Sequence, residues 1–396
     1  MIDLRGRKVF VTGATGGIGG RLVERLVRHH GADVRVLIRN PSSAARLARF
    51  PLTFHMGDVT RSEDLDRAIQ GSELVFHCAY GTTGSQKHHA WVNRVGTERV
   101  LEAAHRAGAS RVVHLSTLMV YGRTGDGDLD ETAPRRRFGN AYSDSKLEAE
   151  AIALQYSRSG RVQVAVLQPT AVYGPYGGVW TTKPLQALKA GRQILINGGD
   201  GFANAVYVDD LVTAMLLAAV RDGAAGEAFL ISGPEPVSWR ELYERFARML
   251  GDGPERTVSM TADEAREYHR KHQRETAHVH QELLRQFKQD QAFRDRLMGT
   301  RELMALREMA SSILPEGLQQ RIKGRMSGNG FASPPRASGE LPILPLTPEM
   351  IDFYIPKTRV RIDKARRLLG YEPAFSLERG MELTEQWARW ADLVFS

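Results

Sequence analysis

A glycine-rich turn near the N-terminus constrains the fold of this chain more than any other sequence feature. An apolar run at 8–12 leads into glycines at positions 13, 16 and 19, and an amphipathic stretch follows from Ile18 to His29. Glycines at this spacing permit a tight turn between a strand and a helix, and they allow backbone N–H groups to approach a phosphate closely. The N-terminus of the helix then faces the negative charge. The pattern predicts a dinucleotide-binding unit, with a purely structural turn as the alternative.

The rest of the first half repeats the same alternation of strand and helix. Apolar runs of strand length occur at 34–38, 52–56, 74–79, 111–116 and 162–167. Amphipathic stretches of helical period lie between them at 65–70, 90–107 and 141–159. Strands that alternate with helices form parallel sheets, because each crossover needs a helix to return the chain to the same edge. The first half is therefore predicted to be one α/β unit with a doubly wound parallel sheet.

The second half has a different texture. After Pro169 the pattern predicts a strand at 205–208, a helix at 209–220, a strand at 228–232 and a helix at 238–250. Between 253 and 345 the regular alternation is lost. The segment 261–297 is highly charged, 302–313 has a helical pattern, and 324–345 is rich in Gly, Ser and Pro and resembles a linker. A thin apolar stripe follows helical spacing within the charged segment, at Val279, Leu283, Phe287, Phe293 and Leu297.

Composition removes several classes of protein. The chain has 396 residues, 54 Lys and Arg against 46 Asp and Glu (net charge +8), and 42% hydrophobic residues, which argues against disorder. One cysteine excludes an intramolecular disulfide, and no run approaches the ~20 apolar residues of a membrane span. Basic residues are scattered except at 135–137, and the histidines lack metal-ligand spacing. We expect a cytoplasmic protein with no nucleic-acid partner, no membrane partner and no metal.

A tyrosine and a lysine four residues apart are the strongest catalytic candidates. Tyr142 and Lys146 fall on one face of the predicted helix at 141–159, and no other tyrosine of the chain has a lysine four residues later. A neighbouring cation favours the phenolate, so Lys146 is expected to lower the pKa of Tyr142 and to suit it for proton transfer with a carbonyl or an alcohol. Taken alone, a tyrosine and a lysine at this spacing are usually solvent-exposed surface residues without a catalytic role.

The combination of these motifs resembles the extended short-chain dehydrogenase/reductase family, in its epimerase/dehydratase-like branch. The resemblance covers the chain from Lys8 to about Gly251 and resumes near 359–373. The motifs that carry it are, in chain order, Thr12-Gly13-x-x-Gly16-x-x-Gly19, Gly57-Asp58-Val59, His77-Cys78-Ala79, Val92-Asn93, Val120-Tyr121-Gly122, Tyr142-x-x-x-Lys146, Gln168-Pro169-Thr170-Ala171-Val172-Tyr173-Gly174 and Tyr207-Val208-Asp209-Asp210. The segment between 251 and 359 has no counterpart in the resemblance.

The resemblance implies a fold and a set of site residues. The fold is a Rossmann-type domain at 1–168, with 203–232 returning to it, and a smaller substrate-binding lobe at 169–396 that carries a long helical insertion at 253–345. We expect the insertion to act as a lid or as a dimer arm. Thr117 is the implied hydroxyl partner of Tyr142 and Lys146, while Ser116 caps or packs. The implied cofactor-binding residues are Gly13, Thr15, Gly16, Gly17, Ile18, Gly19, Arg39, Asp58, Val59, Cys78, Ala79, Tyr80, Asn93, Tyr142, Lys146, Pro169, Thr170 and Val172.

The end of the second predicted strand bears on the choice of cofactor. An acidic residue there would bind the ribose 2′-OH and select NAD. This chain has Ile38 at that position, followed by Arg39, whose guanidinium suits a 2′-phosphate. Of the two forms of NAD(P), NADP is therefore favoured over NAD, with a solvated loop arginine as the alternative interpretation.

Departures from the family pattern narrow the reaction. Dehydratases of the family carry Asp-Glu after the catalytic threonine, whereas this chain has Leu118-Met119. Gln168 stands where sugar-nucleotide enzymes often have arginine, and 203–205 lacks their diphosphate-binding arginine. We expect an NAD(P)-dependent oxidoreductase that acts on a small-molecule carbonyl, an alcohol or a sugar nucleotide and works as a homodimer. A sugar-nucleotide 4-epimerase and a non-catalytic cofactor-sensing scaffold remain as alternatives.

Overall fold

The computed structural model describes residues 2–81, 84–251, 253–289 and 341–394. The apolar stripe expected between Val279 and Leu297 falls outside the side chains it describes. The expected helix at 302–313 and most of the expected linker at 324–345 also lie outside the described residues. No helix in the described part of the chain is both long and apolar enough to cross a membrane.

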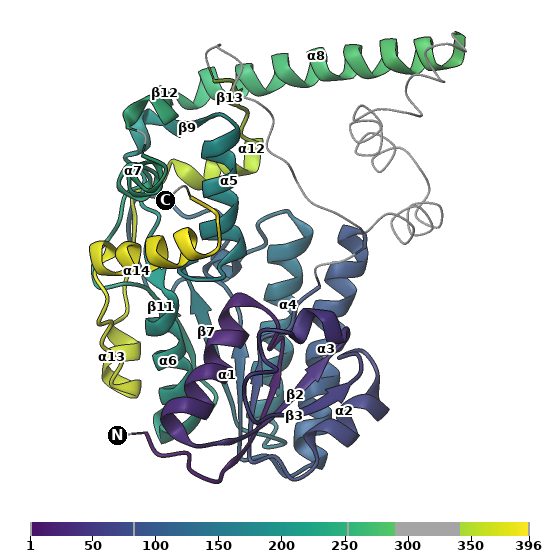
Figure 1. The fold of residues 1–396 in the computed structure, drawn as a ribbon. Coiled ribbons are helices and arrows are strands. Elements are labelled where there is room, and N and C mark those ends of the chain that lie inside the picture. The colour runs from purple at the N-terminus through teal and green to yellow at the C-terminus, as the bar shows by residue number, and fades with distance from the viewer. Residues whose placement is uncertain (1, 82–83, 252, 290–340, 395–396) are drawn as a thin grey trace.

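A seven-stranded sheet forms the centre of the molecule, and every pairing within it is parallel. Its order is β11-β7-β5-β4-β1-β2-β3 (Figure 1). The strands are β1 (Lys8–Thr12), β2 (Asp33–Ile38), β3 (Thr53–Met56), β4 (Leu74–His77), β5 (Arg111–Leu115), β7 (Val164–Pro169) and β11 (Ala228–Ile231). The predicted Rossmann-type fold is confirmed. The order reverses direction between β1 and β4, and such a switch point opens a crevice at the carboxyl ends of the strands.

Helices cover both faces of this sheet. One core contains side chains of α1 (Gly17–His30), α6 (Val208–Val220) and α13 (Asp363–Leu369). The other contains side chains of α2 (Ser62–Ile69), α3 (Gln86–Arg106) and α4 (Ala141–Arg158). Because both faces are buried, the strands are nearly continuous apolar runs, and β4, β5 and β7 have no exposed residue. We call this unit the sheet domain.

Local chemistry sets the ends of the helices that matter for the site. Gly31 adopts the left-handed conformation that ends α1, and its N–H donates to the Leu26 carbonyl. Ser85 caps α3 by accepting from His88 N, and Asn140 caps α4 by accepting from Ser143 N. The cap at Asn140 places Tyr142 in the first turn of α4.

A third apolar core forms what we call the C-terminal lobe. It gathers side chains around Trp239 from α5 (Lys183–Ala190), α7 (Trp239–Met249), α12 (Pro348–Tyr354) and α14 (Leu377–Trp390). A three-stranded parallel sheet in the order β12-β9-β13 belongs to it. Its strands are β9 (Arg192–Ile196), β12 (Thr257–Met260) and β13 (Ile343–Leu344). β13 lies inside the segment 324–345 that the sequence predicted to be a linker. The prediction is wrong for these two residues, because they pair with Arg192 and Gln193 of β9.

Short strand pairs join parts of the chain that are far apart in sequence. β6 (Gly127–Leu129) pairs with β14 (Thr358–Val360), and β8 (Ala171–Tyr173) pairs with β10 (Ala205–Tyr207). Beyond β12, α8 (Ala262–Gln289) extends away from the lobe as one long helix (Figure 1).

Candidate active site

Most of the predicted site residues come together at the carboxyl edge of the large sheet. Gly13 follows β1, Arg39 follows β2, and Asp58 comes just after β3. Cys78, Ala79 and Tyr80 follow β4, Thr117 comes just after β5, and Pro169 ends β7. Since the strands are parallel and in register, these positions share one edge, on either side of the switch point between β1 and β4.

The glycine turn is shaped for close backbone approach. Gly13 has φ +71°, and a Cβ there would lie 2.6 Å from Ala79 N. A Cβ on Gly19 would overlap the Gly13 carbonyl oxygen, so this glycine lets α1 pack tightly against β1. A Cβ on Gly16 would meet only Gly13 O, at 3.3 Å, which leaves the space above this position open.

The start of α1 fits an anionic group. The helix has no side-chain cap at Gly16 and no acidic residue in its first turn. Its first N–H groups and the positive end of its dipole are therefore available to a phosphate. These features suit the pyrophosphate of a dinucleotide.

Two further residues near this turn were missed from the sequence. A Cβ on Gly17 would lie 2.6 Å from the Tyr176 carbonyl oxygen, so the segment around Tyr176 passes directly over the helix start. The Arg46 guanidinium stacks on the Tyr176 ring at 3.6 Å from its centroid and packs beside Gly20. No local pattern around Arg46 pointed to the cradle, because the contact depends on a turn 130 residues later in the chain.

The last residue of β4, His77, makes buried polar contacts, and Cys78 follows it. His77 bonds through Nδ1 to Thr12 Oγ1 (2.8 Å) and through Nε2 to Thr97 Oγ1 (3.0 Å). Burial and then the nearby Lys146 charge lower the pKa of His77 to about 3, so its ring is neutral. Burial raises the pKa of Cys78 to about 12, which keeps it a thiol and fits a packing role.

Several predicted cofactor residues are already engaged by the protein. The Asn93 amide accepts from Gly81 N and donates to Ser145 Oγ, both at 2.9 Å, and so braces the loop after β4 against α4. Asp58 accepts from Thr60 N and Oγ1, and Val59 packs against Gly96 of α3. Thr170 donates to the Ile231 carbonyl at 3.3 Å.

Thr117 and Tyr142 meet at this edge. Thr117 accepts from Met119 N and begins the short 3₁₀ helix η2 (Leu118–Tyr121). The Tyr142 hydroxyl hydrogen-bonds with the Thr117 side chain, while the residue as a whole is 42% exposed. Tyr80 contacts the Tyr142 ring edge-on, with centroids 6.2 Å apart.

The pKa of Tyr142 is raised to about 12, first by burial of its hydroxyl and then by Tyr80. This differs from the lowered pKa that the lysine spacing predicted. The physical reason is that desolvation disfavours the phenolate and outweighs the Thr117 hydrogen bond, which acts in the opposite direction. In the unliganded protein Tyr142 is therefore a protonated phenol.

Lys146 lies one helical turn later, with its ammonium turned inward. Its Nζ donates to the Leu115 carbonyl oxygen (2.8 Å) at the end of β5 and lies 5.9 Å from the Tyr80 ring centroid. Burial lowers the pKa of Lys146 to about 8, opposed by Cys78 and Glu150. The ammonium is thus poised to change charge near neutral pH.

A buried polar network behind the lysine was also missed from the sequence. Glu150 is fully buried on α4 and accepts from Ser116 Oγ (2.6 Å), Gln168 Nε2 (2.8 Å) and Arg135 Nε (2.5 Å). Gln168 in turn accepts from the Tyr121 hydroxyl at 2.8 Å. The signal was present, since Glu150 continues the four-residue spacing of Tyr142 and Lys146 along one helix face.

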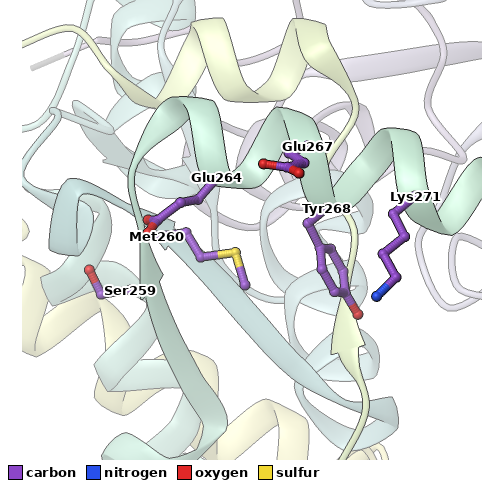
Figure 2. Close-up of a pocket in the computed structure, with 6 residues that line it drawn as sticks. All are labelled: Ser259, Met260, Glu264, Glu267, Tyr268 and Lys271. Carbon is purple, nitrogen blue, oxygen red and sulfur yellow. The ribbon is translucent and has the colours of Figure 1, made fainter.

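A separate hollow of about 410 Å³ lies between β12 and α8, away from these residues (Figure 2). Its lining includes Glu264, Tyr268 and Lys271. Glu264 accepts from Thr261 N and Oγ1 as part of the helix start, and Tyr268 donates to the Ile343 carbonyl. None of the predicted site residues lines it. Nowhere in the described part of the chain do three metal-ligating side chains cluster.

Comparison with known proteins agrees with the fold just described. The sequence model of the NAD dependent epimerase/dehydratase family matches residues 9–232. A 4-hydroxy-2-methyl-3-oxo-4-farnesyl-3,4-dihydroquinoline-1-oxide ketoreductase from Stigmatella aurantiaca is 31% identical over 59% of this chain and 71% of its own. A putative dihydroflavonol 4-reductase from Synechocystis is 30% identical over 63% of this chain and 75% of its own.

Solved structures resemble the whole chain more broadly. An epimerase from Methanothermobacter thermautotrophicus superposes with a TM-score of 0.66 at 20% identity, over 98% of this chain and 95% of its own. At this identity the likeness concerns the fold alone.

Proposed function

Because the chain belongs to the NAD dependent epimerase/dehydratase family and is an enzyme, we propose that it transfers a hydride between a nicotinamide cofactor and a carbonyl or secondary-alcohol carbon. The reacting groups of the protein are Thr117, Tyr142 and Lys146. The observation that carries this proposal is the convergence of these three side chains at the sheet edge next to an uncapped glycine turn.

The residues of the cradle would hold the cofactor. The open space over Gly16 and the free N–H groups at the start of α1 suit its pyrophosphate. Tyr80 and Lys146 lie where the nicotinamide end would reach the triad, beyond the end of β4. The bound nicotinamide supplies the hydride chemistry.

In the reduction, Tyr142 donates its hydroxyl proton to the substrate oxygen as the carbonyl carbon gains a hydride. Its raised pKa of about 12 means that this proton is present throughout the physiological range. Thr117, already in contact with the same hydroxyl, orients the substrate oxygen by a hydrogen bond. The Lys146 ammonium stabilises the tyrosinate that forms, and the product is the alcohol.

Replacement of Tyr142 by phenylalanine tests this mechanism. Tyr142→Phe is expected to lower kcat by at least ~10²-fold, the lower end for the loss of a general acid. The variant should keep its fold and still bind the cofactor, because the glycine cradle is unchanged. Tyr156→Phe is the matched control, since Tyr156 lies on the same helix at its opposite end and is buried away from the triad. Activity near that of the wild type in Tyr142→Phe would contradict the mechanism.

The chain prefers NADP to NAD. Arg39 supports this part of the proposal, because it is exposed at the carboxyl end of β2 and has no ion-pair partner among the described residues. A charge-assisted bond to a 2′-phosphate contributes about 1.5–3 kcal/mol, so NADPH should bind roughly 10- to 150-fold more tightly than NADH. Calorimetry with Arg39→Ala should remove most of this difference, and Arg5→Ala, an exposed arginine on the N-terminal segment, should leave it intact. Equal affinities in the wild type would refute the preference.

A further inference from the structure

A narrow recess beside the triad indicates what kind of molecule the enzyme accepts. Its walls are largely apolar and include Leu118, Met119, Phe138, Phe202 and Phe353. Three of these are aromatic, and they come from both the sheet domain and the C-terminal lobe. The recess is thus formed where the two units meet.

Three of these residues are attached directly to the elements that carry the triad. Leu118 and Met119 follow Thr117 in η2, which the Thr117 side chain caps. Phe138 N donates to Asp144 Oδ1 (2.9 Å) in the first turn of α4, the turn that holds Tyr142. A molecule in the recess would therefore lie against the same turns that position the reacting groups.

The polar groups in the recess are already bonded to the protein. The Asn204 amide donates to the Thr358 carbonyl (2.7 Å) and accepts from Val360 N (3.2 Å). The Thr358 hydroxyl donates to the Gly125 carbonyl at 2.7 Å. These groups hold β14 in place and leave little hydrogen-bonding capacity for a sugar ring.

The cation at the recess is neutralised as well. Among the described lining residues Arg123 is the one cationic side chain, and it pairs with Asp352 at 2.9 Å. Asp352 also pairs with Arg266 of α8 (2.9 Å), and Arg266 reaches Asp263 at 3.0 Å. Two arginines and two carboxylates thus balance each other, and no surplus positive charge points to a diphosphate.

We propose that this recess binds the apolar body of a hydrophobic ketone or secondary alcohol, and that the substrate carries no nucleoside diphosphate. The inference rests on the proposed hydride transfer and names its substrate class. Apolar walls gain free energy by burying apolar surface, whereas a diphosphate in the same place would lose hydration without a free cation to replace it.

The small size of the recess means that its walls must move when a substrate binds. In the unliganded protein the recess is small, with a cavity volume of about 30 Å³. Sites for drug-sized ligands usually reach ~300–1,000 Å³. The substrate therefore spreads the walls on entry, and the aromatic side chains and α12 are the elements that border it.

Binding and turnover of two probes test the substrate class. trans-1-Decalone represents an apolar ring ketone, and UDP represents the diphosphate of a sugar nucleotide. With full-length enzyme, decalone should oxidise NADPH. UDP should show no binding by calorimetry at millimolar concentration, which corresponds to a binding free energy weaker than about −4 kcal/mol. Micromolar binding of UDP together with no turnover of decalone would overturn the inference.

Matched variants locate the effect in the recess. Met119→Arg places a charge among the apolar walls and should raise the KM for decalone at least ~10-fold, about 1.4 kcal/mol. Phe54→Arg is the control, since Phe54 is 39% exposed on the edge strand β3 and lies before the end of the strand where the cofactor residues gather. Phe202→Leu is a milder change and should raise the same KM by a smaller factor. It tests the recess even if Met119→Arg does not fold. An unchanged KM in both recess variants would refute the inference.

Tyr142→Phe separates this inference from the proposed function. If decalone still binds this variant and Met119→Arg abolishes that binding, the substrate class is supported whether or not turnover is seen. Failure of every carbonyl to oxidise NADPH in the wild type would instead contradict the hydride-transfer proposal. Turnover of a UDP-sugar that Tyr142→Phe abolishes and Met119→Arg does not would support the reaction and overturn the substrate class.

Discussion

The sheet domain and the C-terminal lobe both use parallel strands, but the lobe includes a pairing between segments that lie much farther apart in the chain. In the sheet domain, β1 and β2 pair across the single helix α1, and β2 and β3 pair across a connection of 14 residues that contains a short 3₁₀ helix (Pro41–Ala44). In the lobe, β9 pairs with β13, so that Arg192 lies opposite Ile343. A pairing between residues so far apart in the chain costs more chain entropy than a pairing of neighbouring strands, and no local sequence pattern indicates it.

The two regions also differ in how they treat charge. Glu150 in the sheet domain is fully buried, and Arg135 neutralises it with a side chain that is 30% exposed. Asp352 in the lobe is partly exposed, and its partner Arg123 is 65% exposed. Removal of a cation should therefore be costly in the first case and mild in the second, because only the first leaves a charge away from water.

The largest effect is expected at the buried carboxylate. Arg135→Ala should lower the free energy of unfolding by about 3 kcal/mol, because the buried Glu150 carboxylate loses its ion-pair partner. Gln168 already donates to Glu150, so Gln168→Arg in the same background should restore most of the loss by supplying a new cation. Urea unfolding followed by circular dichroism measures both variants. A small effect of Arg135→Ala, or no rescue, would show that Glu150 does not depend on this charge.

The glycine turn provides the next largest effect. Gly19→Ala forces a Cβ against the Gly13 carbonyl and should displace α1 from the cradle. Cofactor affinity should fall about 100-fold, or ~2.7 kcal/mol. Gly125→Ala, where a Cβ meets nothing within 4 Å, is the matched control near the lobe and should bind cofactor normally. Equal cofactor affinities for Gly19→Ala and Gly125→Ala would show that the glycine turn matters no more for cofactor binding than a glycine near the lobe.

Acid should act on the sheet domain through its buried histidines. Burial first, then His77 and Lys146, lower the pKa of His114 well below its usual value, and both of its ring nitrogens lack a partner. The unfolded chain binds a proton there below pH 6.5 and the folded chain does not, so stability is complete above pH 6.5 and is lost as the pH falls below it.

His114→Leu should remove this loss, at most about 2 kcal/mol at pH 5, and leave stability at pH 7.5 unchanged or slightly higher. Thermal unfolding across pH 4.5–7.5 would show it. His29→Gln, at an exposed position on α1, should keep the acid sensitivity of the wild type. A parallel loss of stability in His114→Leu and wild type would mean that His114 does not titrate on unfolding.

The smallest effect is expected in the lobe. Asp352→Asn weakens the pairs with Arg123 and Arg266, yet it should cost only about 1 kcal/mol, because both arginines reach water. High salt should reduce the difference from the wild type, which it should not do for Arg135→Ala. A cost equal to that of Arg135→Ala would mean that the lobe depends on buried charge as much as the sheet domain does.

Much of the sheet domain and its site followed from local sequence. Alternating apolar runs predicted the strands and helices, and the glycine turn together with the Tyr142–Lys146 spacing predicted the edge where the site lies. Residues four apart on a helix share a face in any fold, and a glycine turn after a buried strand has few alternatives. These inferences needed no knowledge of distant contacts.

Other properties were decided only by the tertiary structure. Sequence predicted a lowered pKa for Tyr142, whereas burial raises it. From the sequence, Gln168 stands where related enzymes often have an arginine, so a positive charge is absent at that position. Only the folded chain shows that Arg135 supplies a positive charge to the neighbouring Glu150. The apolar recess joins Met119 to Phe353, which are more than 200 residues apart. Desolvation, charge pairing and pocket shape depend on which distant segments pack together, and spacing along the chain carries no information about that.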